Sequence, residues 1–431
     1  MDHDPGKPPV VTAGLARQFR AIVGDQSVWE GASEDAVAGV VPRLVVAPGS
    51  EQEVAEVLRC ADAGGLAVIP RGGGTKLEWG NPPARADVVL SMAQLNRVVE
   101  HAWADLTVTV EAGCTVSALQ AALAEHGQRL AVDVLWPQRA TVGGVLAAND
   151  SGALRLRYGG LRDLIIGVTL ALPDGTLAAS GGKVVKNVAG YDLPKLATGS
   201  LGTLGLITRA TFRLHSLPHA TRTLTLNAGD AGTTQRLMLA IQDSQLAHAA
   251  LQIRVGQDEP GALDILFEGT PLGLAAQEAA LRTLVGNAQV SDGTPGVWDA
   301  RQELWSRGAD TDIDATIGKL SILPADLATT VGHIAETAAR AGADWTAVIQ
   351  APGLGMIRLV GAVASVHGAL RELRSAIERR NGSLVVLRQP AGESRLEAWG
   401  SPGDALPLMR SLKQRLDPHG TLNAGRFVEG I

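Results

Sequence analysis

The chain has 431 residues and a formal net charge of −6, with 45% hydrophobic residues, 19% charged residues and 51 glycines. This composition is that of a globular protein and excludes a disordered or fibrous one. The basic residues are scattered singly rather than gathered into a stripe or a tail, which argues against a nucleic-acid partner.

The length predicts two or three folded units, because one unit per roughly 100 to 200 residues is usual. Acidic residues and prolines occupy Met1–Gly14, where a secretory signal would need a basic stretch and an apolar run. No apolar segment approaches the roughly 18 residues that a membrane-spanning helix requires. Because the only cysteines, Cys60 and Cys114, also suit a reducing compartment, we predict a cytoplasmic protein. Any association with the inner face of the membrane would come through partners.

The first expected elements are a helix, a strand and a glycine loop. Ser50 and Glu53 have the spacing of a capping box, and Gly64–Gly65 ends the helix that follows them. A buried strand is expected over Leu66–Ile69, and the glycine loop Pro70–Thr75 comes directly after it.

The same alternation continues to about Pro218. Thr115 is expected to cap a helix, and further strands are predicted over Asp87–Leu90, Thr107–Glu111, Leu164–Leu172 and Leu204–Leu214. A first domain is therefore predicted over residues 1–218, with an N-terminal extension to about residue 40. A second domain is predicted over 219–410, and a C-terminal segment of a short helix and a turn over 411–431.

The second domain carries a β-α-β-β-α-β pattern in its latter half, which is the ferredoxin-like order. Its expected elements are Lys319–Leu323, Leu327–Ala341, Trp345–Ile349, Met356–Ala362, Leu370–Arg380 and Ser383–Leu387. Just before them, Trp298 and Trp305 are spaced by seven residues, which predicts that both lie on one helix face.

Four glycine-dense segments in the first half are the candidates for chemistry. They span residues 71–75, 136–152, 181–193 and 199–208. Successive backbone N–H groups in such loops form concavities that suit a pyrophosphate, and small side chains let a flat ring approach the backbone. Each segment alone is also compatible with an ordinary turn or with close helix packing. The dinucleotide G-x-G-x-x-G, P-loop, G-x-S-x-G and H-E-x-x-H motifs are all missing, which disfavours Rossmann, P-loop and hydrolase sites.

Taken in order, the four segments resemble the FAD-binding domain of the vanillyl-alcohol oxidase type, also called the PCMH type, over roughly residues 40–218. Lys186–Asp192 is particularly similar to the smaller FAD-binding subunit, GlcE, of bacterial glycolate oxidase complexes. Leu422–Arg426 resembles the same branch, with Ala424 where its usual pattern has proline, and in that branch the segment returns to the FAD domain. The resemblance implies an α+β fold, with a PCMH-type FAD-binding domain and an α+β ferredoxin-like cap.

The resemblance also implies a set of FAD-binding residues. They are Pro70, Arg71, Gly72, Gly73, Gly74, Thr75, Pro137, Thr141, Gly143, Gly144, Ala148, Asn149, Ser151, Gly152, Lys186, Asn187, Gly205, Ile207 and Asn423. Related proteins that bond FAD covalently use a histidine near the first glycine loop, and no histidine lies near Thr75. Non-covalent FAD is therefore expected.

The activity implied is that of an FAD-binding subunit in a glycolate oxidase-type complex, which oxidises a short 2-hydroxy acid such as glycolate or D-lactate. An iron–sulfur partner subunit is expected to take the electrons, because this chain has no cysteine cluster. A catalytic-type flavin subunit is the other expected partner. Two alternatives stay open: a self-sufficient FAD-dependent dehydrogenase or oxidase, and a flavin-binding assembly subunit without chemistry of its own.

No catalytic residue and no metal site can be assigned from the sequence. His248, His333 and His367 stand alone, so three metal ligands are not visibly assembled. Arg301, Arg307, Arg358 and His333 are candidates for a base in the cap by residue type only.

Overall fold

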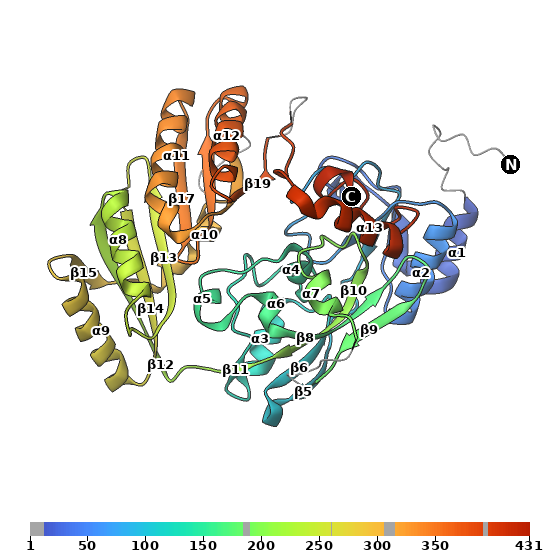
Figure 1. The fold of residues 1–431 in the computed structure, drawn as a ribbon. Helices are drawn as coiled ribbons and strands as arrows, with labels where there is room; N and C mark the ends of the chain where they lie inside the picture. The colour runs from blue at the N-terminus through green and yellow to red at the C-terminus, as the bar shows by residue number, and fades with distance from the viewer. Residues whose placement is uncertain (1–12, 184–189, 260, 306–314, 391–394) are drawn as a thin grey trace.

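The computed structural model describes residues 13–183, 190–259, 261–305, 315–390 and 395–431. Two bodies make up the molecule (Figure 1): an N-terminal body with a four-stranded and a five-stranded sheet, and a cap with one eight-stranded sheet. Within the described ranges, no helix combines the length and the apolar character needed to cross a membrane.

The first sheet of the N-terminal body holds the start of the glycine loop. Its strands, in spatial order, are β1 (Val28–Glu30), β2 (Leu44–Val46), β4 (Val88–Ser91) and β3 (Val68–Arg71). Strands β2, β4 and β3 are parallel; helix α2 connects β2 to β3, and the glycine loop with its turns connects β3 to β4. Helices α1 (Ala13–Val23) and α2 (Glu51–Ala63) pack together beside this sheet.

Ser50 caps α2 as predicted, but the reciprocal bond of a full capping box is displaced by one residue, from Ser50 to Gly49. Ser50 accepts a hydrogen bond from the backbone N–H of Glu53 at 3.2 Å, and the Glu53 carboxylate accepts one from the backbone N–H of Gly49 at 2.7 Å. Gly64 ends the helix, and Gly65 follows with a positive φ of 62°, which suits glycine. The chain then enters β3.

The second sheet is antiparallel throughout and carries the other glycine segments. Its strands, in spatial order, are β5 (Val98–Ala102), β6 (Thr107–Glu111), β10 (Leu206–Arg213), β8 (Ile165–Ala171) and β9 (Leu177–Gly181). The connecting helices are α3 (Val116–Ala124), α4 (Val142–Ala148), α5 (Arg155–Tyr158), α6 (Leu161–Leu164) and α7 (Leu193–Ala197). A small pair of strands, β7 (Gln128–Arg129) and β11 (His215–Ser216), completes the body.

The cap consists of two ferredoxin-like units in one continuous sheet. The second unit contains β16 (Ala315–Ser321), α11 (Leu327–Ala341), β17 (Asp344–Gln350), β18 (Leu354–Val360), α12 (Val363–Glu378) and β19 (Ser383–Arg388). This confirms the predicted order. The first unit repeats it with β12 (Ala220–Gly229), α8 (Ala231–Gln242), β13 (His248–Gly256), β14 (Gly261–Gly269), α9 (Pro271–Val285) and β15 (Gln289–Asp292). Antiparallel pairing of β13 with β17 joins the units.

The two faces of the cap sheet have different neighbours. Helices α9, α8, α11 and α12 lie side by side in that spatial order and cover one face, with Leu320 in the core beneath them. On the opposite face, Ile317 packs with Trp79 and Leu135 of the N-terminal body. Because side chains alternate along a strand, Lys319 also lies on this body-facing side.

The segment that joins the two cap units differs from the prediction. Trp298 lies in a 3-10 turn, Pro295–Asp299, and the helix α10 that follows covers only Ala300–Glu303. The Trp298 indole donates a hydrogen bond to Thr223 within the cap at 3.1 Å, whereas Trp305 stacks on Trp79 of the N-terminal body. A shared helix face for the two tryptophans is therefore wrong, because 3-10 geometry rotates each residue further than an α-helix does.

The chain returns to the N-terminal body after the cap. Helix α13 (Leu406–Leu416) lies over this body rather than over the cap (Figure 1). The residues after it run beside β3, where the Val68 N–H donates to the Thr421 carbonyl at 2.7 Å and the Asn423 N–H donates to the Val68 carbonyl at 3.0 Å.

Candidate functional site

The first glycine loop lies in direct contact with the segment that precedes α4. A Cβ atom on Gly73 would lie 1.6 Å from the carbonyl oxygen of Arg139, and one on Gly72 would lie 2.0 Å from Thr141 Oγ1. No side chain fits at either position without moving backbone or a capping hydroxyl. Backbone atoms therefore form this wall of the site.

Two cavities of about 70 Å³ each follow the loop between the two sheets of the N-terminal body. Both are lined by residues from the glycine loop, from α4 and from the C-terminal segment. The shared lining residues are Pro70, Gly72, Thr141, Gly144, Ala147, Leu201 and Asn423. Gly143 and Ile207 line one cavity, and Thr75 and Ala148 line the other.

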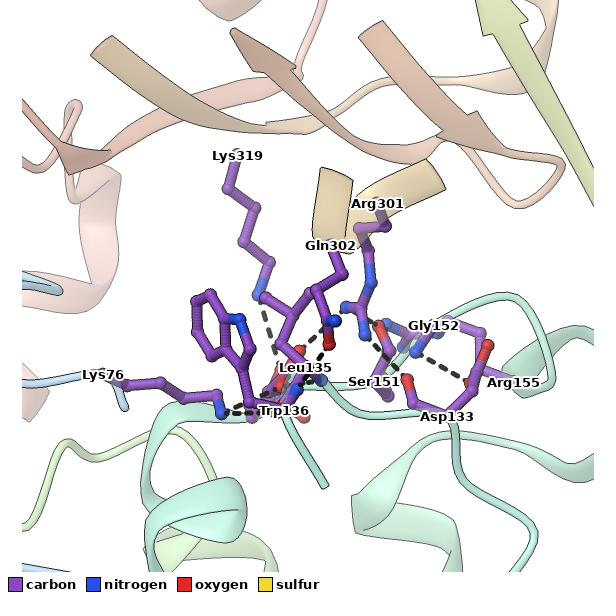
Figure 2. Close-up of polar contacts among 12 residues, drawn as sticks. Lys76, Asp133, Leu135, Trp136, Ser151, Gly152, Arg155, Arg301, Gln302 and Lys319 are labelled. Carbon is purple, nitrogen blue, oxygen red and sulfur yellow. Dashed lines mark hydrogen bonds and ion pairs between the residues drawn. The ribbon is translucent and has the colours of Figure 1, made fainter. Parts of the chain in front are cut away.

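A third cavity, of about 240 Å³, lies where α4 meets the cap sheet. Ala148, Asn149 and Gly199 line it from the N-terminal body, and Lys319 and Ser321 line it from β16. The Lys319 side chain points from the cap toward the N-terminal body (Figure 2), and its ammonium lies 3.5 Å from the carbonyl oxygen of Asn149.

Lys319 has an unusual electrostatic setting. No carboxylate of the described part of the chain lies within ion-pair distance of its ammonium. Burial lowers the pKa of Lys319, the negative charge of Asp150 opposes that shift, and Arg301 and Arg155 add to it. Among the described residues, the amine of Lys319 thus faces the cavity without a carboxylate of its own, and an anionic ligand bound there would favour its charged form.

A fourth cavity, of about 1030 Å³, opens on the outer side of the glycine loop. Gly72–Thr75 form part of its wall, Trp79, Trp136 and Trp305 form another, and four arginines lie around it. These are Arg71, Arg139, Arg388 and Arg395. Arg71 is held by Asp35 at 2.6 Å, so this charge is partly neutralised.

Buried charges lie directly behind the loop. The Lys76 ammonium is 3.1 Å from the Asp150 carboxylate and lies over the rings of Trp79 and Trp136. Arg301 of the cap donates to the same carboxylate at 2.8 Å. Burial alone would raise the pKa of Asp150, but Arg301 and Lys76 hold it below its ordinary value. Asp150 is therefore ionised at neutral pH.

The C-terminal segment closes the site from the side of β3. The amide nitrogen of Asn423 donates to the Leu201 carbonyl, while its Oδ1 atom is buried without a hydrogen-bond partner. Arg426 is 3% exposed and donates to the carbonyls of Leu77 and Trp79, and burial lowers its pKa to about 10. Asn423 therefore offers an unused acceptor beside two cavities, and Arg426 fixes the chain just after the glycine loop.

The structure brings together most of the residues that the sequence analysis assigned to the cofactor. Those that line the four cavities are Pro70, Arg71, Gly72, Gly73, Gly74, Thr75, Thr141, Gly143, Gly144, Ala148, Asn149, Ile207 and Asn423. Pro137, Ser151, Gly152 and Gly205 line none of these four. Lys186 and Asn187 lie outside the described residues.

Several residues of the site were not predicted from the sequence. Lys76 follows Thr75 directly, and its position in the glycine loop was the available signal. Arg301 was considered only as a base, whereas it is buried and paired with Asp150. Arg307 lies outside the described residues. Across the described ranges, no group of three His, Cys, Asp or Glu side chains is arranged to hold a metal ion.

Comparison with known proteins shows which proteins this chain is similar to. Residues 42–181 match the family described as FAD binding domain. The chain is 28% identical to a D-2-hydroxyglutarate dehydrogenase of Xanthomonas citri pv. viticola, over 90% of this chain and 89% of that protein. It is 34% identical to glycolate oxidase subunit GlcD of Bacillus subtilis, over 43% of this chain and 39% of that subunit.

The whole fold also has solved counterparts. p-Cresol methylhydroxylase superposes with a TM-score of 0.78 at 15% identity, covering 97% of this chain and 98% of that one. The chain thus has the PCMH-type fold and carries an FAD-binding domain, and the protein is an FAD-dependent oxidoreductase. The site fits such a cofactor: close-packed glycines suit a pyrophosphate, and the unused Asn423 acceptor suits a hydroxyl donor.

Proposed function

We propose that this chain is the FAD-binding subunit of a glycolate oxidase-type complex and oxidises a short 2-hydroxy acid, with glycolate and D-lactate as the first candidates. The relatives support this class of substrate, because one is a D-2-hydroxyglutarate dehydrogenase and another is a glycolate oxidase subunit. The GlcE-like motif of the sequence favours a subunit role over a self-sufficient enzyme.

In this proposal, FAD lies along the two cavities beside the glycine loop and the cavity between α4 and the cap sheet, and is held without a covalent bond. Pro70–Thr75, Thr141 and Gly144 would take the pyrophosphate, and Ile207 would face the adenine end. Pro137, Ser151, Gly152, Lys186, Asn187 and Gly205 remain proposed contacts. The proposed domain limits are residues 1–218, 219–410 and 411–431.

The single observation that carries the proposal is the position of Lys319. Its amine faces a cavity between the cap and the N-terminal body, and no carboxylate of the described residues pairs with it. A 2-hydroxy acid brings its own carboxylate, which would pair with Lys319 and accept a hydrogen bond from the neighbouring Ser321 hydroxyl. This places the substrate at the junction of the two bodies.

The chemistry divides between the cofactor and the chain. When bound, FAD supplies the acceptor for the hydride that leaves the α-carbon of a hydroxy acid. The residues of this chain hold the carboxylate and exclude water between the cap sheet and α4. With two cysteines in the whole sequence, the chain has too few thiolates for an iron–sulfur centre. An iron–sulfur partner subunit would therefore take the electrons.

The test uses the purified full-length chain. A yellow supernatant after acid precipitation is expected, since no covalent bond would retain the flavin. Anaerobic addition of glycolate, D-lactate or D-2-hydroxyglutarate should then bleach the flavin band, either with the chain alone or with its partner subunits. If the protein binds FAD but no 2-hydroxy acid bleaches it under either condition, the proposed activity is wrong.

A further inference from the structure

One arginine of the cap reaches into the N-terminal body and is almost fully buried there. Arg301 lies on α10 and is 8% exposed. Its guanidinium donates to Asp150 Oδ1 at 2.8 Å, to the Ser151 carbonyl at 2.9 Å and to the Asp133 carbonyl at 2.7 Å. All three acceptors belong to the other body, so Arg301 forms a connection between bodies rather than a contact within the cap (Figure 2).

The two segments that Arg301 joins are also connected to each other. The Asp133 carboxylate accepts the Gly152 N–H at 3.0 Å, and the Asp150 carboxylate accepts the Leu135 N–H at 2.9 Å. A Cβ on Gly152 would lie 2.2 Å from Asp133 Oδ2, so the segments touch. Residues 133–136 and 149–152 therefore form one hydrogen-bonded unit, and Arg301 lies at its centre.

This unit borders the proposed cofactor site on one side and the large outer cavity on the other. Asn149 lines the cavity that Lys319 faces. Trp136 lines the large cavity outside the glycine loop, and its backbone N–H donates to the side-chain oxygen of Gln302 at 3.0 Å. Two consecutive residues of α10 thus hold both edges of the same unit.

We propose that Arg301 is a positioning residue: through Asp150, Ser151 and Asp133, docking of α10 sets the backbone of residues 133–136 and 149–152 into the form that receives the flavin. We call this set of contacts the Arg301 latch. The inference rests on the cofactor placement proposed above. It assigns the cap a part in building the FAD site, in addition to covering it.

The geometry of the latch calls for a guanidinium. Its planar fork reaches three oxygens in different directions, whereas a lysine ammonium is a single centre on a flexible stem. Asp150 already has an ammonium partner in Lys76 at 3.1 Å, so charge neutrality alone does not require Arg301. The two backbone carbonyls are what a lysine would leave unbound.

The molecule offers two matched controls. Arg254 forms a two-pronged pair with Asp264 at 2.7 and 3.0 Å, entirely inside the cap. Arg129 of the N-terminal body pairs with Glu268 of the cap at 2.6 and 2.9 Å and also joins the two bodies. None of these four residues lines a cavity of the proposed site. R254Q therefore controls for loss of a buried ion pair, and R129Q for loss of contact between the bodies.

The experiment compares R301Q, R301K, R254Q and R129Q as full-length chains stripped of flavin and titrated with FAD. Affinity, the visible circular dichroism of the bound flavin and the melting temperature are measured. R301Q should weaken FAD binding by ~10-fold or more and change the visible dichroism, because a buried partner is lost. R301K should recover only part of the affinity. R254Q and R129Q should melt earlier but bind FAD within about twofold of the wild type.

Two results would overturn the latch: R301Q binding FAD as the wild type does, with an unchanged dichroism, or R129Q losing as much affinity as R301Q. Should R301Q fail to fold, Q302A tests the same edge with a smaller change, and wild-type affinity and dichroism in Q302A would count against the proposal. Titration of FAD needs no substrate. A wild type that binds FAD but oxidises no hydroxy acid would therefore refute the proposed function alone.

Discussion

The two ends of the proposed cofactor site are built in different ways. At the glycine-loop end, the wall is backbone, and Gly72 and Gly73 approach Thr141 and Arg139 too closely for any side chain. At the cap end, the wall is supported from behind by buried charges contributed by both bodies, with Asp150 between Lys76 and Arg301. The first end depends on the absence of side chains, and the second depends on their pairing.

This difference separates two kinds of sensitivity. A backbone wall fails when volume is added, and conservative additions are no safer than large ones. A buried charge cluster fails when one partner is removed, because the remaining charge keeps its desolvation cost. Changes at the glycine end should therefore act on cofactor affinity first, whereas changes at the cap end should also affect stability or substrate affinity.

The largest effect on cofactor binding is expected for Gly73→Ala. The added methyl would meet the Arg139 carbonyl oxygen at 1.6 Å, so the loop must move away from α4. FAD affinity should fall by ~100-fold or more, since the backbone donors of the loop would no longer converge. Gly368→Ala on the cap helix α12 is the control, because a Cβ there has no atom of the described residues within 4 Å. Fluorescence titration with FAD measures both, and equal affinities would contradict the backbone wall.

The next effect concerns stability. Asp150→Asn leaves Lys76 and Arg301 buried without a counter-charge, which should cost ~3–5 kcal/mol of unfolding free energy. Arg301 and Lys76 hold the pKa of Asp150 low against the effect of burial. The contribution of Asp150 to the free energy of unfolding is therefore complete above the usual aspartate pKa of about 3.9, and it is lost as the pH falls through the lowered native pKa. The difference between wild type and variant should hold from neutral pH to about pH 4 and shrink below that.

Denaturant unfolding at several pH values checks this prediction. A difference that grows as the solution becomes more acidic would contradict the assignment of Asp150 as an ionised group.

A smaller effect is expected for Lys319→Met, and it should fall on substrate rather than on cofactor. KM for the 2-hydroxy acid should rise by about 10-fold because one charge-assisted hydrogen bond to the substrate is lost. FAD affinity should change little. Burial lowers the pKa of Lys319, so the wild-type KM should begin to rise at a pH below the usual lysine value of about 10.4. The variant should show no such rise. Lys195→Met, on an exposed lysine, is the control.

The smallest effect is expected for Ser321→Ala. This hydroxyl lines the same cavity as Lys319 but carries no charge, so KM should rise only about 2- to 10-fold. Steady-state kinetics measures it against Ser375→Ala, whose hydroxyl bonds the Arg371 carbonyl on the outer helix α12. A larger effect for Ser321→Ala than for Lys319→Met would reverse the order of importance proposed for this cavity.

The sequence singled out the glycine-loop end of the proposed site and not the charge cluster, for a physical reason. A glycine loop can be recognised within a few residues of sequence, so Gly72–Thr75 and Thr141–Gly144 could be proposed as cofactor-binding segments. The charge cluster is not local: Lys76, Asp150 and Arg301 meet only because the cap docks on the N-terminal body. In a single sequence, nothing indicates that a lysine beside a glycine loop and an arginine on a short helix contact the same aspartate.

The same reasoning applies to the fold. The α+β class, the capping of α2 by Ser50 and the ferredoxin-like order of the second cap unit follow from local patterns, and the structure confirms them. The repetition of that order in the first cap unit was missed, because no element in it was assigned beyond a general alternation. Trp298 and Trp305 were placed on one face because heptad spacing says nothing about a 3-10 turn.

The return of the chain to β3 has a consequence for the order of assembly in the cell. Asn423 binds the backbone of Val68, and the whole cap is encoded between them. During synthesis, the glycine loop therefore leaves the ribosome long before the C-terminal segment that lies beside it. The proposed flavin site is complete only after the whole cap has been translated, and a chain that ends inside the cap would lack the side formed by Asn423.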